Sequence, residues 1–403
     1  MLPLENFKVL DLSRLAAGNM VSHMFADFGA DVIKVEKPGK GDDLRNWQVN
    51  DVAHWWAVYS RNKRSIALNL KEEEGLKLLK ELVKSADVFI ENFVPGTLEK
   101  WGVGPDKLLE LNKNLIILRI SGWGQTGIYK DAPGFGSLVE GMSGFASMTG
   151  EENQKPLLPP LALADMVAGL TGFGAILMAV IASKKNQIRG QVIDLSLFEP
   201  LFSILGPWAA SYKISGKTPP RMGNRSNVAA PRGIYKTKDN KFVSLSASMQ
   251  SMWEKLAITI GAEELIKDPR FITNSDRLSN QDDLDDVISN FIKKFDRDPL
   301  LKVFSKEGIT VGPVLDISEI IEHPYILDRN ILIEHHNNEY GNILMHQAFP
   351  RLSKTPGKVK SSAPSIGENT NNILILLDPD PDKTGIQVNS PHQFKTQQII
   401  FVH

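Results

Sequence analysis

The stretch that decides the fold is residues 9–35, which read VLDLSRLAAGNMVSHMFADFGADVIKV. Residues 9–12 and 32–35 are two short apolar runs. Between them, residues 20–28 have the apolar spacing of a helix and stop before Gly29, a residue suited to the position after a helix end. A strand, a helix and a second strand in this order predict a parallel β-sheet that is covered by helices.

The same rhythm continues through the first half of the chain. Residues 72–85 have the pattern of an amphipathic helix, and residues 163–184 predict a long buried helix. Further strand-like runs are 65–70, 88–90, 115–120 and 192–195. We therefore predict an α/β fold with a Rossmann-like large domain built on a parallel sheet.

A chain of 403 residues exceeds what one compact core usually serves, so a second domain is expected. The pattern changes near Pro207, and residues 234–245 predict a hairpin with its turn at Asp239 and Asn240, followed by charged helices. The predicted boundaries are 1–200 for the N-terminal part of the large domain, 201–220 for a linker, 221–315 for a smaller α+β domain, 316–376 for a return to the large domain, with a strand at 343–349, and 377–403 for an irregular tail.

Composition narrows the function classes. The formal net charge of −1 and the pI of about 6.7 favour neither nucleic acid nor a membrane surface as a partner. The chain has no cysteine, which excludes disulfides, thiolate zinc sites and a cysteine nucleophile. No secretory signal, transit peptide or apolar run of about 18 residues is visible, so a cytoplasmic protein is expected.

A basic cluster follows the second predicted strand and consists of Lys34, Lys37, Lys40, Arg45, Arg61, Lys63, Arg64 and Lys71. It is either a solvated surface or a site for a multiply phosphorylated ligand. The backbone amides of residues 14–19 can receive an anion, because this small, glycine-bearing loop opens a helix. The chain lacks the G-x-G-x-x-G and G-K-[ST] patterns, so a nicotinamide-dependent dehydrogenase lacks its fingerprint.

Polar and aromatic loops follow two further predicted strands. Residues 92–96 come after the run that ends at Ile90, and residues 122–127 follow the next strand. Together with residues 14–19, they make three strand ends with loops of this kind. Such loops line the ligand crevice of an open α/β sheet, so one shared ligand edge is expected.

Asp165 is a lone carboxylate in an apolar run that continues to Ala182. A buried charge there is costly unless it has a partner. Two readings stay open, a helix N-cap and a functional carboxylate, and a helix N-terminus stabilises an anion in either case. Gly169, Gly172 and Gly174 are positions for close packing or for the approach of a ligand.

In their order and content, many segments resemble the class III CoA-transferase family, the group of formyl-CoA transferase, carnitine CoA-transferase and α-methylacyl-CoA racemase. The likeness runs from about Leu4 to about Ile375. The matching segments are residues 9–13, 17–18, 26–36, 62–68, 91–96, 121–127, 142–144, 149–150, 161–169, 190–194, 312–314 and 367–370.

The resemblance implies an interlocked homodimer with CoA against the N-terminal part. It also implies a transferase that moves CoA from an acyl-CoA, such as succinyl-CoA, to a small carboxylic acid, with CoA as substrate and no prosthetic group or metal. Asp165 matches the catalytic aspartate, which forms an acyl anhydride and an aspartyl-CoA thioester. The positions that match CoA contacts are Lys37, Arg64, Leu68, Asn92, Phe93 and Lys100, with Ala17 beside the thioester.

Two alternatives remain within the resemblance. The racemase branch carries a histidine in a Gly-His-Asp segment, whereas the matching stretch here is Pro133, Gly134, Phe135 and Gly136. General base chemistry needs such a group within reach, which places the racemase second. A CoA-binding protein without catalysis is the other alternative. In the small domain, Arg225 is predicted to pair with the distal carboxylate of a dicarboxylic acid, or else to be a surface arginine.

Overall fold

The computed structural model describes residues 1–377, so the predicted tail, apart from Leu377, lies outside the described residues. The chain divides into two compact units. The first contains Met1–Phe145, Leu158–Trp208 and the segment from Asn330 onward, and the second contains Ala146–Leu157 and Ala209–Arg329.

Six parallel strands form the centre of the first unit, in the order β3-β2-β1-β4-β5-β6. The strands are β1 Lys8–Asp11, β2 Asp31–Glu36, β3 Arg64–Ala67, β4 Val88–Glu91, β5 Ile116–Ser121 and β6 Gln191–Ser196. This is the doubly wound order, whose direction reverses between β1 and β4. The predicted α/β class with a parallel sheet is confirmed.

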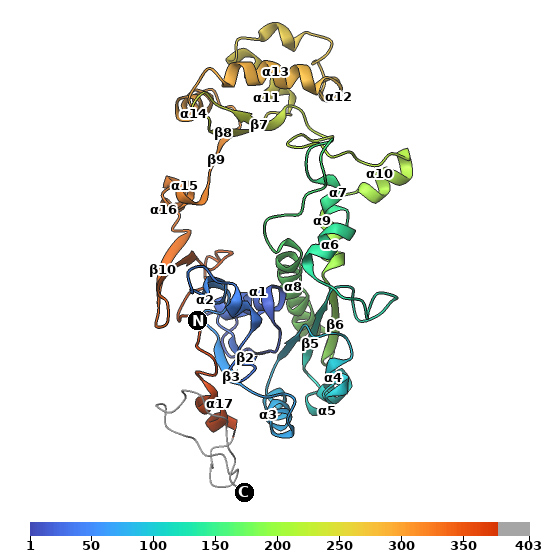
Figure 1. Ribbon diagram of the computed structural model, residues 1–403, viewed down its shortest axis with the longest axis vertical. Coiled ribbons are helices and arrows are strands. Elements are labelled where there is room, and N and C mark those ends of the chain that lie inside the picture. The colour runs from blue at the N-terminus through green and yellow to red at the C-terminus, as the bar shows by residue number, and fades with distance from the viewer. Residues whose placement is uncertain (378–403) are drawn as a thin grey trace. The chain divides into compact units, whose positions relative to one another are not determined.

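Helices cover both faces of this sheet. They are α1 Leu15–Asp27, α2 His54–Tyr59, α3 Glu73–Lys84, α4 Thr97–Lys100, α5 Pro105–Leu111, α6 Gly136–Met142, α8 Leu163–Asn186, α9 Phe198–Ile204 and α17 Thr370–Leu377, with a 3-10 helix at Asp43–Asn46. In Figure 1, α1 and α8 lie beside each other, apart from α3 and α5.

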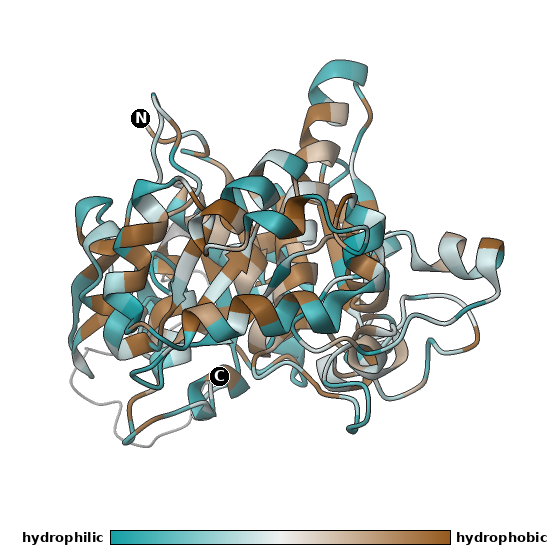
Figure 2. Ribbon diagram, turned by 90° about the horizontal axis from the view of Figure 1, so that it is seen from above, coloured by the Kyte–Doolittle hydropathy of each residue, from teal (hydrophilic) through white to brown (hydrophobic). Residues whose placement is uncertain are grey.

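Each face of the sheet has its own apolar core, because successive strand residues point to opposite sides. Val9 and Ile90 pack with α1 and α8 on one face. Leu10 and Phe89 pack with α3, α5 and α17 on the other. Figure 2 shows the resulting amphipathic pattern, in which brown and teal residues alternate along many of the helices.

The apolar helix α8 runs for 24 residues, from Leu163 to Asn186. Of the described residues, it alone forms a helix with the length and composition of a membrane span. The sequence predicts a buried helix, but only one side is buried. Ala168, Gly172 and Ile176 are in the core, whereas Met178 and Ile181 are 66% and 52% exposed.

The second unit is an α+β structure around a three-stranded antiparallel sheet in the order β7-β8-β9. Its elements are β7 Arg232–Lys236, β8 Phe242–Ser246, β9 Val311–Val314, α11 Gln250–Thr259, α12 Asn274–Ser279, α13 Gln281–Ile292, α14 Arg297–Lys306, α15 Ile317–Ile321, α16 Pro324–Asp328 and a 3-10 helix at Glu263–Ile266. The short helices α7 Phe145–Met148 and α10 Trp208–Ser215 begin at the boundaries between the units. The core of this unit includes Trp253, Phe271 and Ile288.

The boundaries differ from the predicted ones at three places. Residues 201–220, predicted as a linker, contain α10 and most of α9, because Leu201 is buried in the sheet core. Residues 146–157 belong to the second unit, where the Gly223 N–H donates to the Gly150 carbonyl. Residues 316–329 also stay in the second unit, where Glu319 forms an ion pair with Arg297.

The C-terminal return of the first unit binds β3 and the 3-10 helix at Asp43–Asn46 through hydrogen bonds. Asn369 Oδ1 accepts the Ser65 N–H at 2.9 Å, and the Pro364 carbonyl accepts Arg45 Nη2 at 2.9 Å. The predicted strand at 343–349 is β11 Gly341–His346, which pairs with β10 Leu332–Asn337 in a hairpin of its own.

Candidate active site

Asp165 occupies the first turn of α8, but it is not the N-cap. The cap residue is Ala162, which makes no side-chain cap bond. The prediction that Asp165 is the helix N-cap is therefore wrong, because its carboxylate does not cap the N-terminus of α8 from the cap position. The backbone of Ala17, at the start of α1, lies near this carboxylate and favours its ionised form.

The helices α1 and α8 approach each other closely beside Asp165, and this approach depends on glycine. A Cβ atom at Gly169 would lie 2.6 Å from Met20 Cβ and 2.9 Å from the Ala17 carbonyl oxygen. At Gly172 it would lie 3.1 Å from Val21 Cγ2. Both glycines are therefore packing positions, whereas Gly174 faces open space. This contact brings the loop after β1 to the nucleophile candidate.

A second carboxylate, Glu140 of α6, lies near Asp165. Glu140 is 3% exposed, and its Oε1 accepts the N–H of Ala164 at 3.2 Å. Burial, followed by the negative charge of Glu140, raises the pKa of Asp165 from 3.8 to about 6. The sequence analysis missed Glu140, because a single acid in a short helix is usually a surface residue and only the fold shows that it is buried.

The segment before α6 leaves room for the Asp165 carboxylate. A Cβ atom at Gly136 would lie 2.6 Å from Asp165 Oδ2, so a larger residue would collide with the carboxylate. The neighbouring Phe135 is 62% exposed. Gly134 packs backbone to backbone on Gly122 in the loop after β5, which places this segment at the same sheet edge. None of residues 133–136 has an ionisable side chain.

The loops after β1 and β4 are joined at the point where the strand order reverses. Asn92 Oδ1 accepts the Arg14 N–H at 2.8 Å, and Asn92 Nδ2 donates to the Arg14 carbonyl at 2.7 Å. The Arg14 guanidinium lies 5.6 Å from the centre of the Phe93 ring. Since β1, β4 and β5 are adjacent, their three loops share one edge, as the sequence predicts.

The other predicted contact residues are distributed unevenly. Lys37, exposed, and Leu68, buried, follow the carboxyl ends of β2 and β3, and the exposed Lys100 ends α4. Arg64 instead begins β3, at the opposite sheet edge, where its Nη2 lies 2.6 Å from Asp31 Oδ2. Arg225 belongs to the second unit.

Arg225 lines a hollow of about 520 Å³ within the second unit and is paired there with carboxylates. Its guanidinium lies 2.7 Å from both Asp282 and Asp285. Asp285 also accepts the Tyr235 hydroxyl at 2.6 Å. A role in acceptor binding therefore requires that the incoming carboxylate compete with two aspartates.

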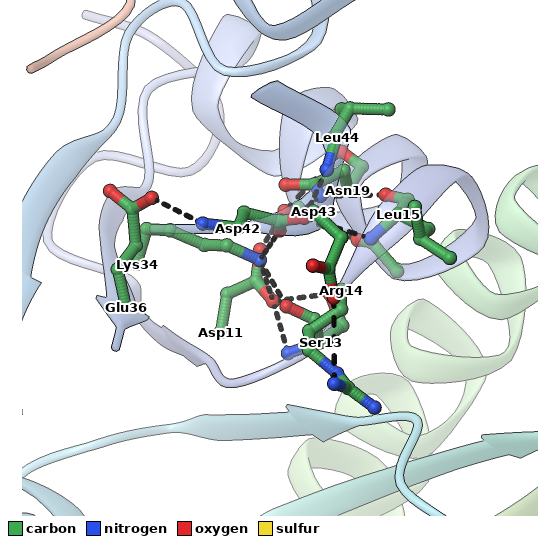
Figure 3. A network of polar contacts seen from close by, with 12 residues as sticks. Asp11, Ser13, Arg14, Leu15, Asn19, Lys34, Glu36, Asp42, Asp43 and Leu44 are labelled. Carbon is green, nitrogen blue, oxygen red and sulfur yellow. Dashed lines mark hydrogen bonds and ion pairs between the residues drawn. The ribbon is translucent and has the colours of Figure 1, made fainter. Parts of the chain in front are cut away.

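Half of the basic cluster is internal, which neither interpretation of the sequence anticipated. Lys34, Arg45, Arg61 and Lys63 are buried, and their partners are the acids Asp11, Asp27, Glu36 and Asp42. Figure 3 shows Lys34 between Asp11 and Asp42 below the loop after β1. The acids come from other elements, so the pairing is invisible in the local sequence. Within residues 1–377, no group of three or more acidic or histidine side chains could hold a metal ion.

Comparisons with known proteins bear on this geometry. Residues 4–370 match the family model described as CoA-transferase family III. The chain is 36% identical over 379 residues to succinyl-CoA–D-citramalate CoA-transferase of Chloroflexus aurantiacus, covering 93% of this chain and 94% of that protein. It is 32% identical to human succinyl-CoA:glutarate CoA-transferase, covering 92% and 85%. The crystal structure of a CaiB/BaiF family protein from Brucella suis superimposes with a TM-score of 0.83 at 34% identity, covering 94% and 100%.

Proposed function

The chain belongs to CoA-transferase family III, and we propose that it transfers CoA from succinyl-CoA to a dicarboxylic acid with Asp165 as the nucleophile. The observation that carries the nucleophile is the half-buried Asp165 carboxylate, whose pKa is raised to about 6. Such a carboxylate remains about nine-tenths ionised at pH 7 and is more basic than an exposed aspartate.

The reaction is a series of acyl exchanges. The Asp165 carboxylate attacks the thioester carbonyl of the donor, and the CoA thiolate leaves, so that a mixed anhydride forms. The thiolate attacks the aspartyl carbonyl of this anhydride, which releases succinate and leaves an aspartyl-CoA thioester. The acceptor carboxylate displaces the thiolate to form a second anhydride. The thiolate then attacks the acceptor carbonyl, which yields the new acyl-CoA and restores Asp165.

The surroundings of Asp165 suit this series of acyl exchanges. The backbone of Ala17 lies beside the carboxylate and favours its ionised form, so its N–H is suited to hold one oxygen while the other attacks. Gly136 leaves room for the carboxylate itself, since a Cβ atom there would lie 2.6 Å from Asp165 Oδ2. The charge of Glu140 adds to burial in raising the basicity of Asp165.

We place CoA along the carboxyl edge of the first unit's sheet. The half-buried Phe93 offers apolar surface for the pantetheine arm, whereas Leu68 lies in the core against which Phe93 packs. The exposed Lys37 and Lys100 offer positive charge for phosphates. Asn92 contributes by holding the two loops together rather than through a free amide. Arg64 reaches CoA only if it leaves Asp31, which makes it the weakest member of the set.

The acceptor class follows from the two curated relatives, whose names give D-citramalate and glutarate as acceptors. Arg225 is our candidate for the distal carboxylate, because a guanidinium binds a carboxylate through two hydrogen bonds. If Arg225→Ala changes the apparent affinity for glutarate and for a monocarboxylate by the same factor, this assignment is wrong. Lys238→Ala serves as a control in the same unit.

A homodimer is part of the proposal. The exposed apolar face of α8, with Met178 and Ile181, is suited to cover by a second copy of the chain. Sedimentation analysis tests this, and a monomer at micromolar concentration would contradict it. The cytoplasmic location stays a prediction, to be checked by cell fractionation.

A substrate screen tests the function. The protein is incubated with succinyl-CoA and a panel of acids, and new thioesters are followed by mass spectrometry. Transfer that persists in Asp165→Ala would refute the mechanism. Exchange of the α-proton with deuterated water in the absence of transfer would favour the racemase alternative, and binding of CoA without either reaction would favour a non-catalytic protein.

A further inference from the structure

A buried group of four charges lies below the loop after β1. It consists of Asp11, Lys34, Asp42 and Lys63, none of them more than 3% exposed. Lys34 Nζ lies 2.9 Å from Asp42 Oδ2 and 3.3 Å from Asp11 Oδ1, and Lys63 Nζ lies 3.7 Å from Asp11 Oδ2. Lys34 is the main positive charge between the two aspartates, because burial lowers the pKa of Lys63 to about 7. Loss of any one partner leaves a buried charge uncompensated.

Asp42 connects this group to the backbone of Leu15, as Figure 3 shows. Asp42 Oδ1 accepts the Leu15 N–H at 2.9 Å. Asp42 Oδ2 accepts Asn19 Nδ2 at 2.8 Å, and the same Nδ2 donates to the Leu15 carbonyl at 2.7 Å. The Asp42 carboxylate therefore holds the Leu15 N–H directly and the Leu15 carbonyl through Asn19.

Leu15 has a backbone conformation that a leucine rarely adopts. Its φ angle is +60°, in the left-handed region that favours glycine. A larger residue stays there only where its surroundings hold it. The conformation sets the direction of the first turn of α1, which carries Ala17 two residues later. The backbone of Ala17 lies beside the first turns of α8, since a Cβ atom at Gly169, one turn after Asp165, would lie 2.9 Å from the Ala17 carbonyl oxygen.

We propose that Asp42 is a positioning residue for the transfer reaction, because it holds Leu15 in the left-handed conformation that places the backbone of Ala17 beside Asp165. The inference rests on the proposed role of Asp165 as the nucleophile. Asp42 itself contacts neither substrate nor reacting atoms. Its effect is transmitted through the backbone of residues 15–17.

The decisive test is rescue by glycine, because glycine adopts the left-handed conformation without steric cost. Asp42→Ala should lower kcat about 10- to 100-fold, as expected when a reacting group is misplaced, and should change KM for succinyl-CoA less than about two-fold. Leu15→Gly alone should stay within about three-fold of wild type. The double variant should recover about ten-fold of the lost kcat.

Asp42→Asn separates positioning from stability. It loses the charge that balances Lys34, as Asp42→Ala does, but keeps an oxygen for the Leu15 N–H. A positioning role predicts a higher kcat for Asp42→Asn than for Asp42→Ala, with both variants destabilised towards urea. A role in stability alone predicts equal kcat values for the folded proteins.

Asn19→Ala, with and without Leu15→Gly, provides the same rescue test should Asp42→Ala not fold, since it removes the hydrogen bond to the Leu15 carbonyl. A kcat that is unchanged in both single variants, or a loss that glycine does not relieve, would overturn the proposal. Asp165→Ala is assayed alongside. If it retains transfer, the proposed function fails; if it is inactive while Asp42→Ala is fully active, only the positioning role fails.

Discussion

Glu140 holds the backbone amide that immediately precedes Asp165. Its Oε1 accepts the Ala164 N–H at 3.2 Å, and its charge adds to burial in raising the pKa of Asp165 to about 6. The two carboxylates come from different helices, α6 and α8. The acidity of the proposed nucleophile is thus set by a residue outside its own segment.

Glu140→Gln should shift the acidic limb of kcat/KM from about pH 6 towards pH 5. The amide removes the negative charge that raises the pKa of Asp165 but keeps an oxygen for the Ala164 N–H. Rates measured between pH 4.5 and 8 test this, with the exposed Glu110→Gln as control. An unshifted limb would mean that burial alone sets the acidity.

Asp165→Asn should abolish transfer and at the same time stabilise the fold at pH 8. Because folding raises the pKa of Asp165 above 3.8, the ionised group disfavours the folded state. The variant should unfold like wild type near pH 4 and be more stable by about 2 kcal/mol at pH 8. Urea unfolding at both pH values measures the difference, and a gain that is equal at both would contradict the prediction.

Gly169→Ala should separate α1 from α8 and lower both stability and kcat. The new methyl group would lie 2.6 Å from Met20 Cβ, and such overpacking costs about 1–3 kcal/mol. Gly174→Ala is the matched control on the same helix, because nothing lies within 4 Å of its Cβ position. It should stabilise the helix by about 0.5–1 kcal/mol and leave kcat unchanged. Equal effects at the two sites would refute the close-packing argument.

His23→Leu should make the fold less sensitive to acid. Burial, and then the charge of Arg61, holds the pKa of His23 well below 6.5, and neither ring nitrogen has a hydrogen-bond partner among the described residues. The unfolded chain therefore takes up a proton here below about pH 6.5, and wild-type stability falls as the pH drops. Between pH 6.5 and 5.5 this loss is about 1 kcal/mol and should disappear in the variant. The exposed His336→Leu should leave the pH dependence unchanged.

The strands and helices around residues 9–35 were predictable because their signal is local. Alternating and helical spacings of apolar residues can be recognised without knowing which distant residues they contact. The observed elements differ from the predicted ones mainly at their ends. The family resemblance was equally visible, since it depends on ordered motifs, and residues 4–370 match the family model.

Several features could not be predicted from the sequence, for a common reason. The buried partners of Lys34 and Lys63, the location of Arg64 at the amino edge of the sheet and the nearness of Glu140 all depend on residues distant in the chain. Charged residues look the same in sequence whether they face water or each other. The predicted boundaries near 201–220 and 316–329 differ from the observed ones for the same reason. They depend on contacts such as the burial of Leu201 and the ion pair between Arg297 and Glu319.

By itself, the sequence determined the parallel sheet, the helix that carries Asp165 and the family, because periodicity and motif order are properties of neighbouring residues. Only the tertiary structure decided what surrounds Asp165. The close crossing of α1 and α8 at Gly169, the backbone of Ala17 and the charge of Glu140 meet there because separate segments pack together. Burial and electrostatics act through space, so the chemistry of this aspartate is a property of the fold.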